Sequence, residues 1–153
     1  VHEIARAQID FGYRRSRLNH LIVTAVELAL TLGDPVTLRM ERLRCMEHKK
    51  RTQPLADRSA GCCFRNPTLE RDVEDIGAEG ELVSAGLVLE RAGCKGMSVG
   101  GATVSELHAN FITAGSTACA RDVIELMDRA RERVLERLGI RLEREVVVWA
   151  RTP

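Results

Sequence analysis

Two adjacent thiols in the segment GCCFRNP, residues 61–67, are the side chains of this sequence best suited to chemistry. Gly61 permits a tight turn before them and a helix-breaking proline follows, so the segment can present a side chain. The guanidinium of Arg65 would favour a thiolate, whereas a thiol that delivers a proton must stay protonated, and the sequence leaves both directions open. The alternative interpretation is that Cys62 and Cys63 are small buried apolar side chains.

A second candidate is the segment FGYRRSRL, residues 11–18, in which three arginines accompany a tyrosine. Guanidinium groups bind carboxylate or phosphate oxygens in a bidentate way, so this segment is suited to holding an anion. Taken alone, it is a basic turn. Glu145 is a third candidate, because a carboxyl group among apolar residues lies either at a strand entrance facing solvent or in a cleft that uses its charge or proton.

Other patterns favour ordinary structure. The cysteines form no CxxC pair and the four histidines are scattered, so the spacing does not support a metal site. Gly96, Gly100 and Gly101 match neither known phosphate-binding glycine pattern and are expected in turns. His108 precedes an apolar strand, where a hydrogen-bonded structural histidine is the more frequent outcome. Glutamates alternate with the arginines of residues 129–144 at helical pairing distances, which indicates a solvated face.

Composition limits the class of protein. The chain has 153 residues, 44% hydrophobic and 29% charged, with a formal net charge of +1, which indicates one compact soluble domain or two small ones. The near-neutral balance and the 3% aromatic content argue against nucleic-acid binding. No apolar run approaches the roughly 20 residues that span a bilayer. Five cysteines without a disulfide spacing favour a reducing cytoplasm, and a start at Val1 without a leader predicts a start inside a longer protein.

The elements expected to position these side chains are mixed. Residues 21–30, apolar and partly β-branched, are predicted to form a strand. Asp34 and Pro35 then supply a helix start, and Val36, Met40, Leu43 and Met46 recur at helical spacing, so an amphipathic helix is predicted over residues 36–50. Pro54 breaks the periodicity, which places a boundary between two structural units near Leu55.

The second half is predicted in more detail. Residues 68–82 read as an acidic surface loop, 85–92 as a short helix ended by Gly93, and 94–113 as turns feeding short strands, the last over 109–113. The apolar stripe of residues 123–138 predicts a helix from Ala120 to Gly139. EVVVWA, residues 145–150, is predicted to be a strand. Segregated helices and strands indicate an α+β fold.

Four segments occur in an order that carries a resemblance: FGYRRS, KKRTQPLADRSAGCCFRNP, SAGLVLERAGCKGMSVGGATVSELHANFI and LEREV. Together they resemble the C-terminal part of UDP-N-acetylenolpyruvoylglucosamine reductase, also called UDP-N-acetylmuramate dehydrogenase, a flavoenzyme family of peptidoglycan precursor synthesis. The resemblance implies FAD and NADPH as cofactors. It also implies hydride addition to C3 of the enolpyruvyl group, protonation at C2, and UDP-N-acetylmuramate as the product.

The resemblance also assigns roles to residues. Arg14 matches the arginine that binds the substrate carboxylate, with Tyr13 beside it in the pocket. Glu145 matches the catalytic glutamate, which would have to be protonated or hydrogen-bonded through its proton to help an anion. Cys62 stands where the family usually has a serine proton donor, and we interpret it as the donor here.

The remaining implied positions bind substrate. Asn66 belongs to the same loop as Cys62. Gln53, Arg51 and His108 match positions near the phosphates of the nucleotide sugar.

By the same resemblance, residues 1–55 would be the end of the second FAD-binding domain and residues 56–153 the α+β substrate domain. The family's N-terminal FAD-binding portion has no counterpart here, and a strand over residues 21–30 would then expose an unpaired edge. An alternative to the enzyme is a non-catalytic nucleotide-sugar-binding module or a degenerate remnant. Arg14, Asn66 and Glu145 are all kept, which favours the enzyme.

Overall fold

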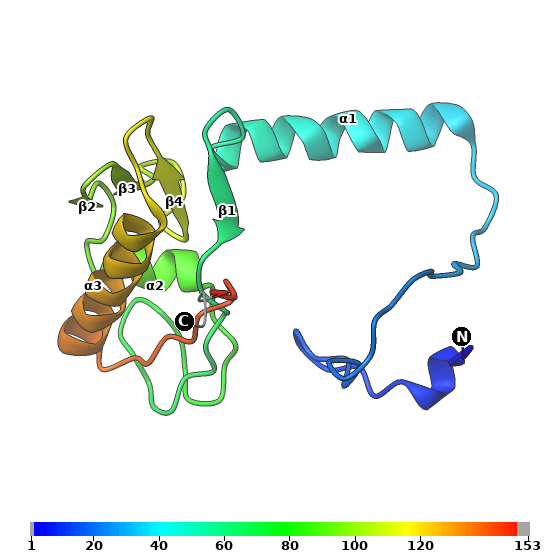
Figure 1. Ribbon diagram of the computed structural model, residues 1–153, viewed down its shortest axis with the longest axis horizontal. Coiled ribbons are helices and arrows are strands. Elements are labelled where there is room, and N and C mark those ends of the chain that lie inside the picture. The colour runs from blue at the N-terminus through cyan, green and yellow to red at the C-terminus, as the bar shows by residue number, and fades with distance from the viewer. Residues whose placement is uncertain (1, 150–153) are drawn as a thin grey trace. The chain divides into compact units, whose positions relative to one another are not determined.

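The computed structural model describes residues 2–149, and its contacts divide the chain into two compact units, Val1–Leu38 and Arg39–Pro153. Figure 1 shows the ribbon with its elements labelled. The two units are described separately below. The boundary predicted near Leu55 from the resemblance, between residues 1–55 and 56–153, remains a prediction.

The first unit contains little regular structure. A short 3-10 helix, η1, covers Arg6–Gln8, and a tight turn closes where the Gly12 amide donates to the Arg15 carbonyl at 2.8 Å and the Arg15 amide donates back at 3.1 Å. Residues 21–30 are extended and exposed and pair with no described strand, so the predicted strand is wrong in this structure. An extended apolar run becomes a strand only when a neighbour accepts its backbone hydrogen bonds.

Helix α1, Pro35–Thr52, confirms the helix predicted over residues 36–50. Its start is capped as the sequence indicated, because the Asp34 carboxylate accepts from the Thr37 amide at 2.8 Å and from the Thr37 hydroxyl at 2.7 Å. The apolar side chains Val36, Met40, Leu43 and Met46 are nevertheless exposed. The predicted apolar face is therefore largely exposed among residues 2–149.

The second unit is built on a four-stranded antiparallel sheet. Its strands are β1 (Ser59–Cys62), β2 (Ser98–Val99), β3 (Ala102–Val104) and β4 (Phe111–Ala114), in the order β1-β4-β3-β2. The sequence predicted the β2–β4 region as turns feeding short strands, and it missed β1, which was expected as a tight turn. The register shifts within β1, between Ser59 and Cys62.

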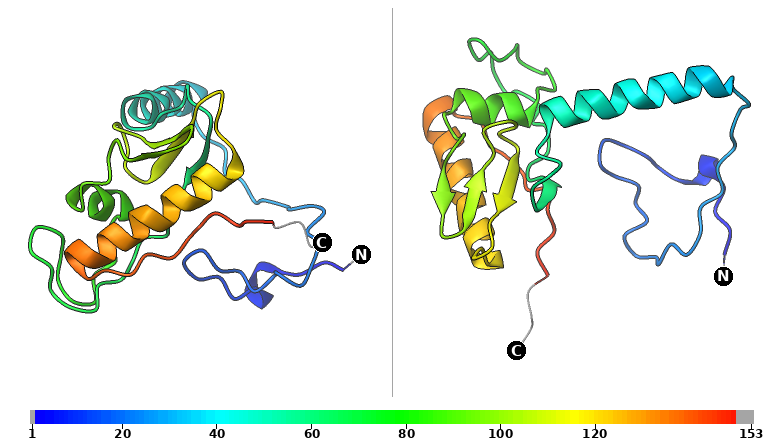
Figure 2. Two further views of the ribbon diagram at one scale, coloured as in Figure 1. Left: turned by 60° about the vertical axis from the view of Figure 1, so that its left-hand side comes forward. Right: turned by 90° about the horizontal axis from the view of Figure 1, so that it is seen from above.

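Two helices of this unit follow their predicted bounds. Helix α2 covers Ala85–Arg91, and helix α3 covers Ala120–Leu138 and ends at Gly139 in the left-handed conformation, φ 67°. Helix α3 packs against β2 and β3, as the views of Figure 2 show. Its buried side chains, Leu126, Met127, Ala130 and Val134, are those of the predicted apolar stripe. The fold is α+β, as predicted.

Two segments have no regular structure. Residues 68–82 form the predicted loop, which a 3.1 Å hydrogen bond from Arg71 Nη2 to the Leu138 carbonyl ties to the end of α3. The loop is not wholly on the surface, because Leu69 is buried in the core. The strand predicted at residues 145–150 is wrong for its described part, because Val147 and Trp149 are 77% and 92% exposed and no strand lies beside them. Ala150 lies outside the described residues. None of the helices in residues 2–149 is long and apolar enough to cross a membrane.

Candidate functional site

Three backbone segments of the second unit lie side by side around Phe64. The Cys63 amide donates to the Asn110 carbonyl at 2.8 Å, and the Cys63 carbonyl accepts from the Glu145 amide at 2.8 Å. Phe64 and Arg144 form an antiparallel bridge. The segment that carries Cys62 and Asn66 is therefore held directly beside the segment that carries Glu145, although about half of the chain separates them in sequence.

Asn110 holds this arrangement from one side, and sequence reasoning missed its role. Its side chain is buried, its Oδ1 accepts from the Phe64 amide at 2.9 Å, and its Nδ2 donates to the Phe64 carbonyl at 2.8 Å. One carboxamide thus supplies the acceptor and the donor that a neighbouring strand would supply. The signal in the sequence was an asparagine directly before the apolar strand Phe111–Ala114, where a polar side chain is buried only with partners.

The two adjacent thiols have different environments. Cys63 is 1% exposed, and burial raises the pKa of its thiol to about 11. Cys63 is therefore a small apolar core side chain that stays protonated near neutral pH. Cys62 is half-buried at the end of β1. The alternative interpretation is therefore confirmed for Cys63, and the role of Cys62 stays a prediction. The structure describes all five cysteines, and none forms a disulfide.

Asn66 and His108 both lie against the start of α2. Asn66 Oδ1 accepts from the Ala85 amide at 3.0 Å. A Cβ atom on Gly86 would approach the His108 ring at 2.8 Å, so only glycine leaves room for the imidazole. The loop after Cys62 and the loop before β4 therefore meet at one helix end.

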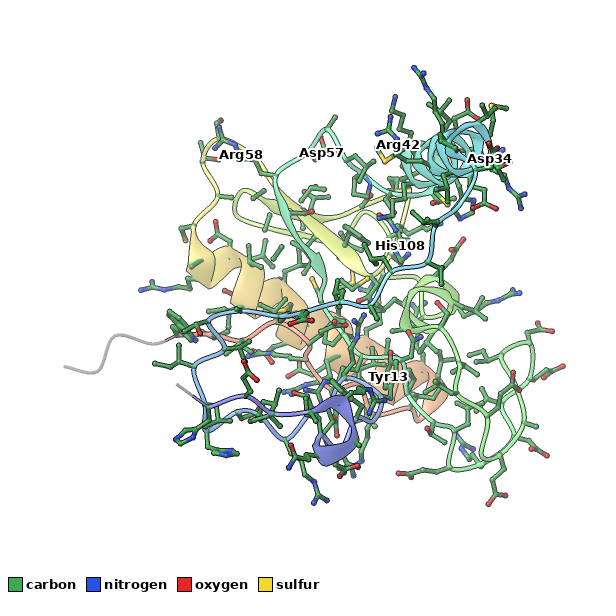
Figure 3. All side chains as sticks on the ribbon, turned by 90° about the vertical axis from the view of Figure 1, so that its right-hand side faces the viewer. Tyr13, Asp34, Arg42, Asp57, Arg58 and His108 are labelled. Carbon is green, nitrogen blue, oxygen red and sulfur yellow. The ribbon has the colours of Figure 1, made fainter. Side chains whose placement is uncertain are left out.

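His108 has a defined protonation pattern. Its Nδ1 accepts from the Asn110 amide at 3.2 Å, and its ring meets Phe111 edge to face at 4.9 Å between centroids (His108 is labelled in Figure 3). Burial is the main cause that lowers the pKa of His108. A neutral ring whose Nδ1 accepts must carry its proton on Nε2. The structural-histidine interpretation is thus confirmed in its contacts, and the ring retains one donor.

Arg65 contacts the segment that carries Glu145. Its Nη1 lies 3.5 Å from Glu143 Oε2, and its amide donates to the Glu143 carbonyl at 2.9 Å. Arg144, the next residue along that segment, places Nη2 2.6 Å from Asp128 Oδ1 of α3. Both guanidinium groups therefore hold the segment that carries Glu145.

Arg51 and Gln53 lie at the end of α1 and in the turn that follows it. The Gln53 amide donates to the Lys49 carbonyl at 2.8 Å, and Arg51 is exposed. Their predicted contact with the phosphates of a nucleotide sugar stays a prediction.

Tyr13 and Arg14 belong to the first unit. Arg14 takes a left-handed backbone conformation, φ 53°, in the turn that Gly12 and Arg15 close, and its Cζ lies 5.8 Å from the centre of the Tyr13 ring (Tyr13 is labelled in Figure 3). Arg15 and Arg17 both approach the Asp10 carboxylate, at 3.7 and 2.9 Å. The presence of Arg14 at the same site as Cys62 and Glu145 remains a prediction.

The glycine cluster is a turn, as expected. A Cβ on Gly100 would meet the Asp122 carboxylate at 2.5 Å, and the Gly101 amide donates to Asp122 Oδ2 at 3.2 Å. A carboxylate therefore occupies the place that a phosphate would need. Within residues 2–149 no group of three histidine, cysteine or acidic side chains is arranged to hold a metal ion.

Known proteins resemble this chain over nearly all its length. The family model described as "UDP-N-acetylenolpyruvoylglucosamine reductase, C-terminal domain" matches residues 53–149. A reductase of that name from Symbiobacterium thermophilum, numbered 2, is 39% identical over 100% of this chain and 46% of its own length. The reductase from Moorella thermoacetica is 41% identical over 97% of this chain and 45% of its own length.

One solved structure that resembles this chain has the same enzyme name as both relatives. The crystal structure of the UDP-N-acetylenolpyruvylglucosamine reductase from Thermus caldophilus superposes with a TM-score of 0.73 and 36% identity, over 97% of this chain and 48% of that one. This chain therefore spans about half the length of the curated relatives it matches.

Proposed function

Because the chain belongs to the UDP-N-acetylenolpyruvoylglucosamine reductase family, we propose that it carries the substrate-binding and acid-base half of that oxidoreductase. The reaction proposed is the FAD-dependent, NADPH-driven reduction of UDP-N-acetylenolpyruvoylglucosamine to UDP-N-acetylmuramate, in the cytoplasm, for peptidoglycan precursor synthesis. The observation that carries the proposal is the 2.8 Å hydrogen bond from the Glu145 amide to the Cys63 carbonyl, which holds the two candidate acid groups on neighbouring segments.

The chemistry needs a cation and a proton donor. When hydride is added at C3 of the enolpyruvyl group, negative charge develops at C2 and spreads into the carboxylate. Arg14 meets that charge in the proposal. The Cys62 thiol gives its proton to C2, so one C–H bond forms at each carbon while the double bond is lost, and the thiolate then takes a proton from solvent. Glu145, with its proton, stabilises the developing anion.

The polar groups around Cys62 are proposed to bind the substrate. Asn66 lies in the same loop as Cys62, and Tyr13 accompanies Arg14. His108 keeps a donor on Nε2, which suits a phosphate oxygen of the nucleotide sugar. Gln53 and Arg51 complete the set proposed for the phosphates.

The glycine cluster does not fit a phosphate of FAD or NADPH. The cluster with two adjacent glycines, at Gly100 and Gly101, faces the carboxylate of Asp122, which would repel a phosphate. We therefore derive no step through either cofactor from this chain, and both belong to the proposal as properties that the resemblance implies.

The test uses a joined protein, in which residues 1–153 are fused to the part of the Moorella thermoacetica reductase that this chain does not span. We expect NADPH oxidation that depends on UDP-N-acetylenolpyruvoylglucosamine, and we expect the unfused chain to bind that substrate without oxidising NADPH. A joined protein that contains FAD and binds substrate but never oxidises NADPH would favour the alternative, a non-catalytic nucleotide-sugar-binding module or remnant.

A further inference from the structure

The segment that carries Glu145 is extended, and its side chains alternate between two faces. Ile140 and Leu142 are 7% and 4% exposed and belong to the core, and Val146 also packs against the core. Arg144 lies in the same even-numbered series and is partly buried. Since successive side chains of an extended segment point to opposite faces, Glu145 is turned to the other side. The face on which Glu145 lies is therefore linked to the face that Arg144 takes.

Asp128 of α3 fixes Arg144. Arg144 Nη2 lies 2.6 Å from Asp128 Oδ1, and the two side chains are 27% and 37% exposed. Arg144 Nε is buried and has no hydrogen-bond partner within the described part of the chain. Asp128 itself is on a helix whose neighbouring side chains Leu126, Met127 and Ala130 are buried in the core. The guanidinium is thus largely withdrawn from water and depends on one carboxylate carried by a rigid element.

We propose that Asp128 is a positioning residue for Glu145, acting through its ion pair with Arg144. The inference rests on the proposed function, in which Glu145 stabilises the developing anion. Neither Asp128 nor Arg144 touches the substrate in this proposal. Their effect is to keep residue 144 against α3. Glu145, whose amide donates a hydrogen bond to the Cys63 carbonyl, then presents its carboxyl group toward the segment that carries Cys62.

Loss of the Asp128 charge should act on Glu145 more than on the fold. The remaining guanidinium would be partly buried without its counter-charge, which favours its movement toward solvent. Arg144 and Glu145 share a peptide bond, so we expect the Glu145 carboxyl group to shift to the extent that the backbone of residue 144 turns with its side chain. Small displacements of catalytic groups lower reaction rates by about 10- to 100-fold.

The variant to make is Asp128→Asn, with three companions. Asp128→Glu keeps the negative charge and should restore both kcat and the Glu145 signals to their wild-type values. Glu125→Gln breaks an ion pair of the same helix with the same 2.6 Å distance, to Arg129, and should have no effect. Arg131→Gln removes the second partner of Asp128, whose Nη2 is 3.1 Å from Oδ1, and leaves Arg144 in place.

Two readouts separate this inference from the proposed function. In the joined protein, Asp128→Asn should lower kcat about tenfold with KM changed less than about twofold, whereas Glu125→Gln and Arg131→Gln stay at the wild-type rate. In the unfused chain, the amide and carboxyl NMR signals of Glu145 should shift in Asp128→Asn and return in Asp128→Glu.

Equal Glu145 signals in Asp128→Asn and Glu125→Gln would overturn the positioning role, whatever the enzyme does. A shifted signal together with unchanged kcat would also overturn it. If the wild-type joined protein is inactive, the proposed function fails, and the Glu145 signals still decide whether Asp128 positions that residue.

Discussion

Residues 2–53 and residues 54–149 both contain apolar runs and many charged residues, but their structures differ greatly. Among the described residues 2–53 not one is buried, whereas a connected core runs through the rest of the chain. The most apolar run of the chain, residues 21–30, lies in the exposed region and remains extended. The strand Phe111–Ala114 is shorter and forms because β1 and β3 lie on its two sides. A partner for the backbone, rather than apolar character alone, decides whether a segment becomes a strand.

The largest test of this comparison uses leucine in each region. Leu126 is fully buried on α3, so Leu126→Ala should lower the free energy of unfolding by about 2–4 kcal/mol through lost burial and a cavity. Leu28 is 70% exposed, so Leu28→Ala should change it by less than about 0.5 kcal/mol. Urea unfolding followed by circular dichroism measures both. Similar losses in the two variants would mean that residues 21–30 pack against something in solution.

A second test replaces cysteines in both regions and measures turnover of the joined protein. Cys62→Ala should lower kcat about 100-fold, because the proposed proton donor is lost, and Cys62→Ser should retain most of the activity. Cys45, exposed on α1, is the control, and Cys45→Ser should have no effect. Equal rates for the serine and alanine variants at position 62 would remove Cys62 from the mechanism.

A third test compares two asparagines. Asn110→Asp keeps the shape of the side chain but loses the Nδ2 donor to the Phe64 carbonyl, and it should cost about 2 kcal/mol of unfolding free energy. Asn19→Asp, at an exposed position, should cost less than about 0.5 kcal/mol. Hydrogen exchange at the Phe64 amide should quicken only in the first variant. Unchanged protection there would show that the carboxamide does not hold the loop.

The smallest effect concerns pH. Burial lowers the pKa of His108 below its ordinary value, so the unfolded chain binds this proton more readily than the folded chain. The stability contributed by neutral His108 is complete above the ordinary pKa of about 6.5 and is lost as pH falls below it. Urea unfolding on both sides of that pH should show the loss. His108→Gln should reduce the loss, and His20→Gln, at an exposed position, should not.

Helices were predictable because their signals are local. Asp34, Pro35 and Gly139 mark helix ends through contacts within a few residues, and the structure confirms all three. Strands were less predictable, because β1 exists through pairing with β4, far away in sequence. The strands expected at residues 21–30 and 145–150 had suitable residues, but no described residue of either segment belongs to the sheet.

The candidate site divides in the same way. Residue types and resemblance pointed to Cys62, Asn66 and Glu145, and the structure brings their segments together. The sequence carried a signal that Asn110 is buried with partners, but it did not identify the partners of Asn110 or Asp128, because each acts across more than ten residues on a segment that carries no local pattern. Arg14 lies in the other unit, Val1–Leu38.

The backbone conformation at Gly139 limits which residues can replace it during evolution. Its backbone, at φ 67°, favours glycine, and a Cβ there would also approach Arg71 Nη2 at 2.5 Å. Asparagine tolerates that backbone better than other residues do, and the end of the flexible Arg71 side chain can move aside for its Cβ. The left-handed backbone is therefore the stricter of the two constraints, because Leu69 keeps the loop in the core even when the bond from Arg71 to the Leu138 carbonyl is lost. A library randomised at position 139 and selected for folding should return mostly glycine, with asparagine as the most frequent exception.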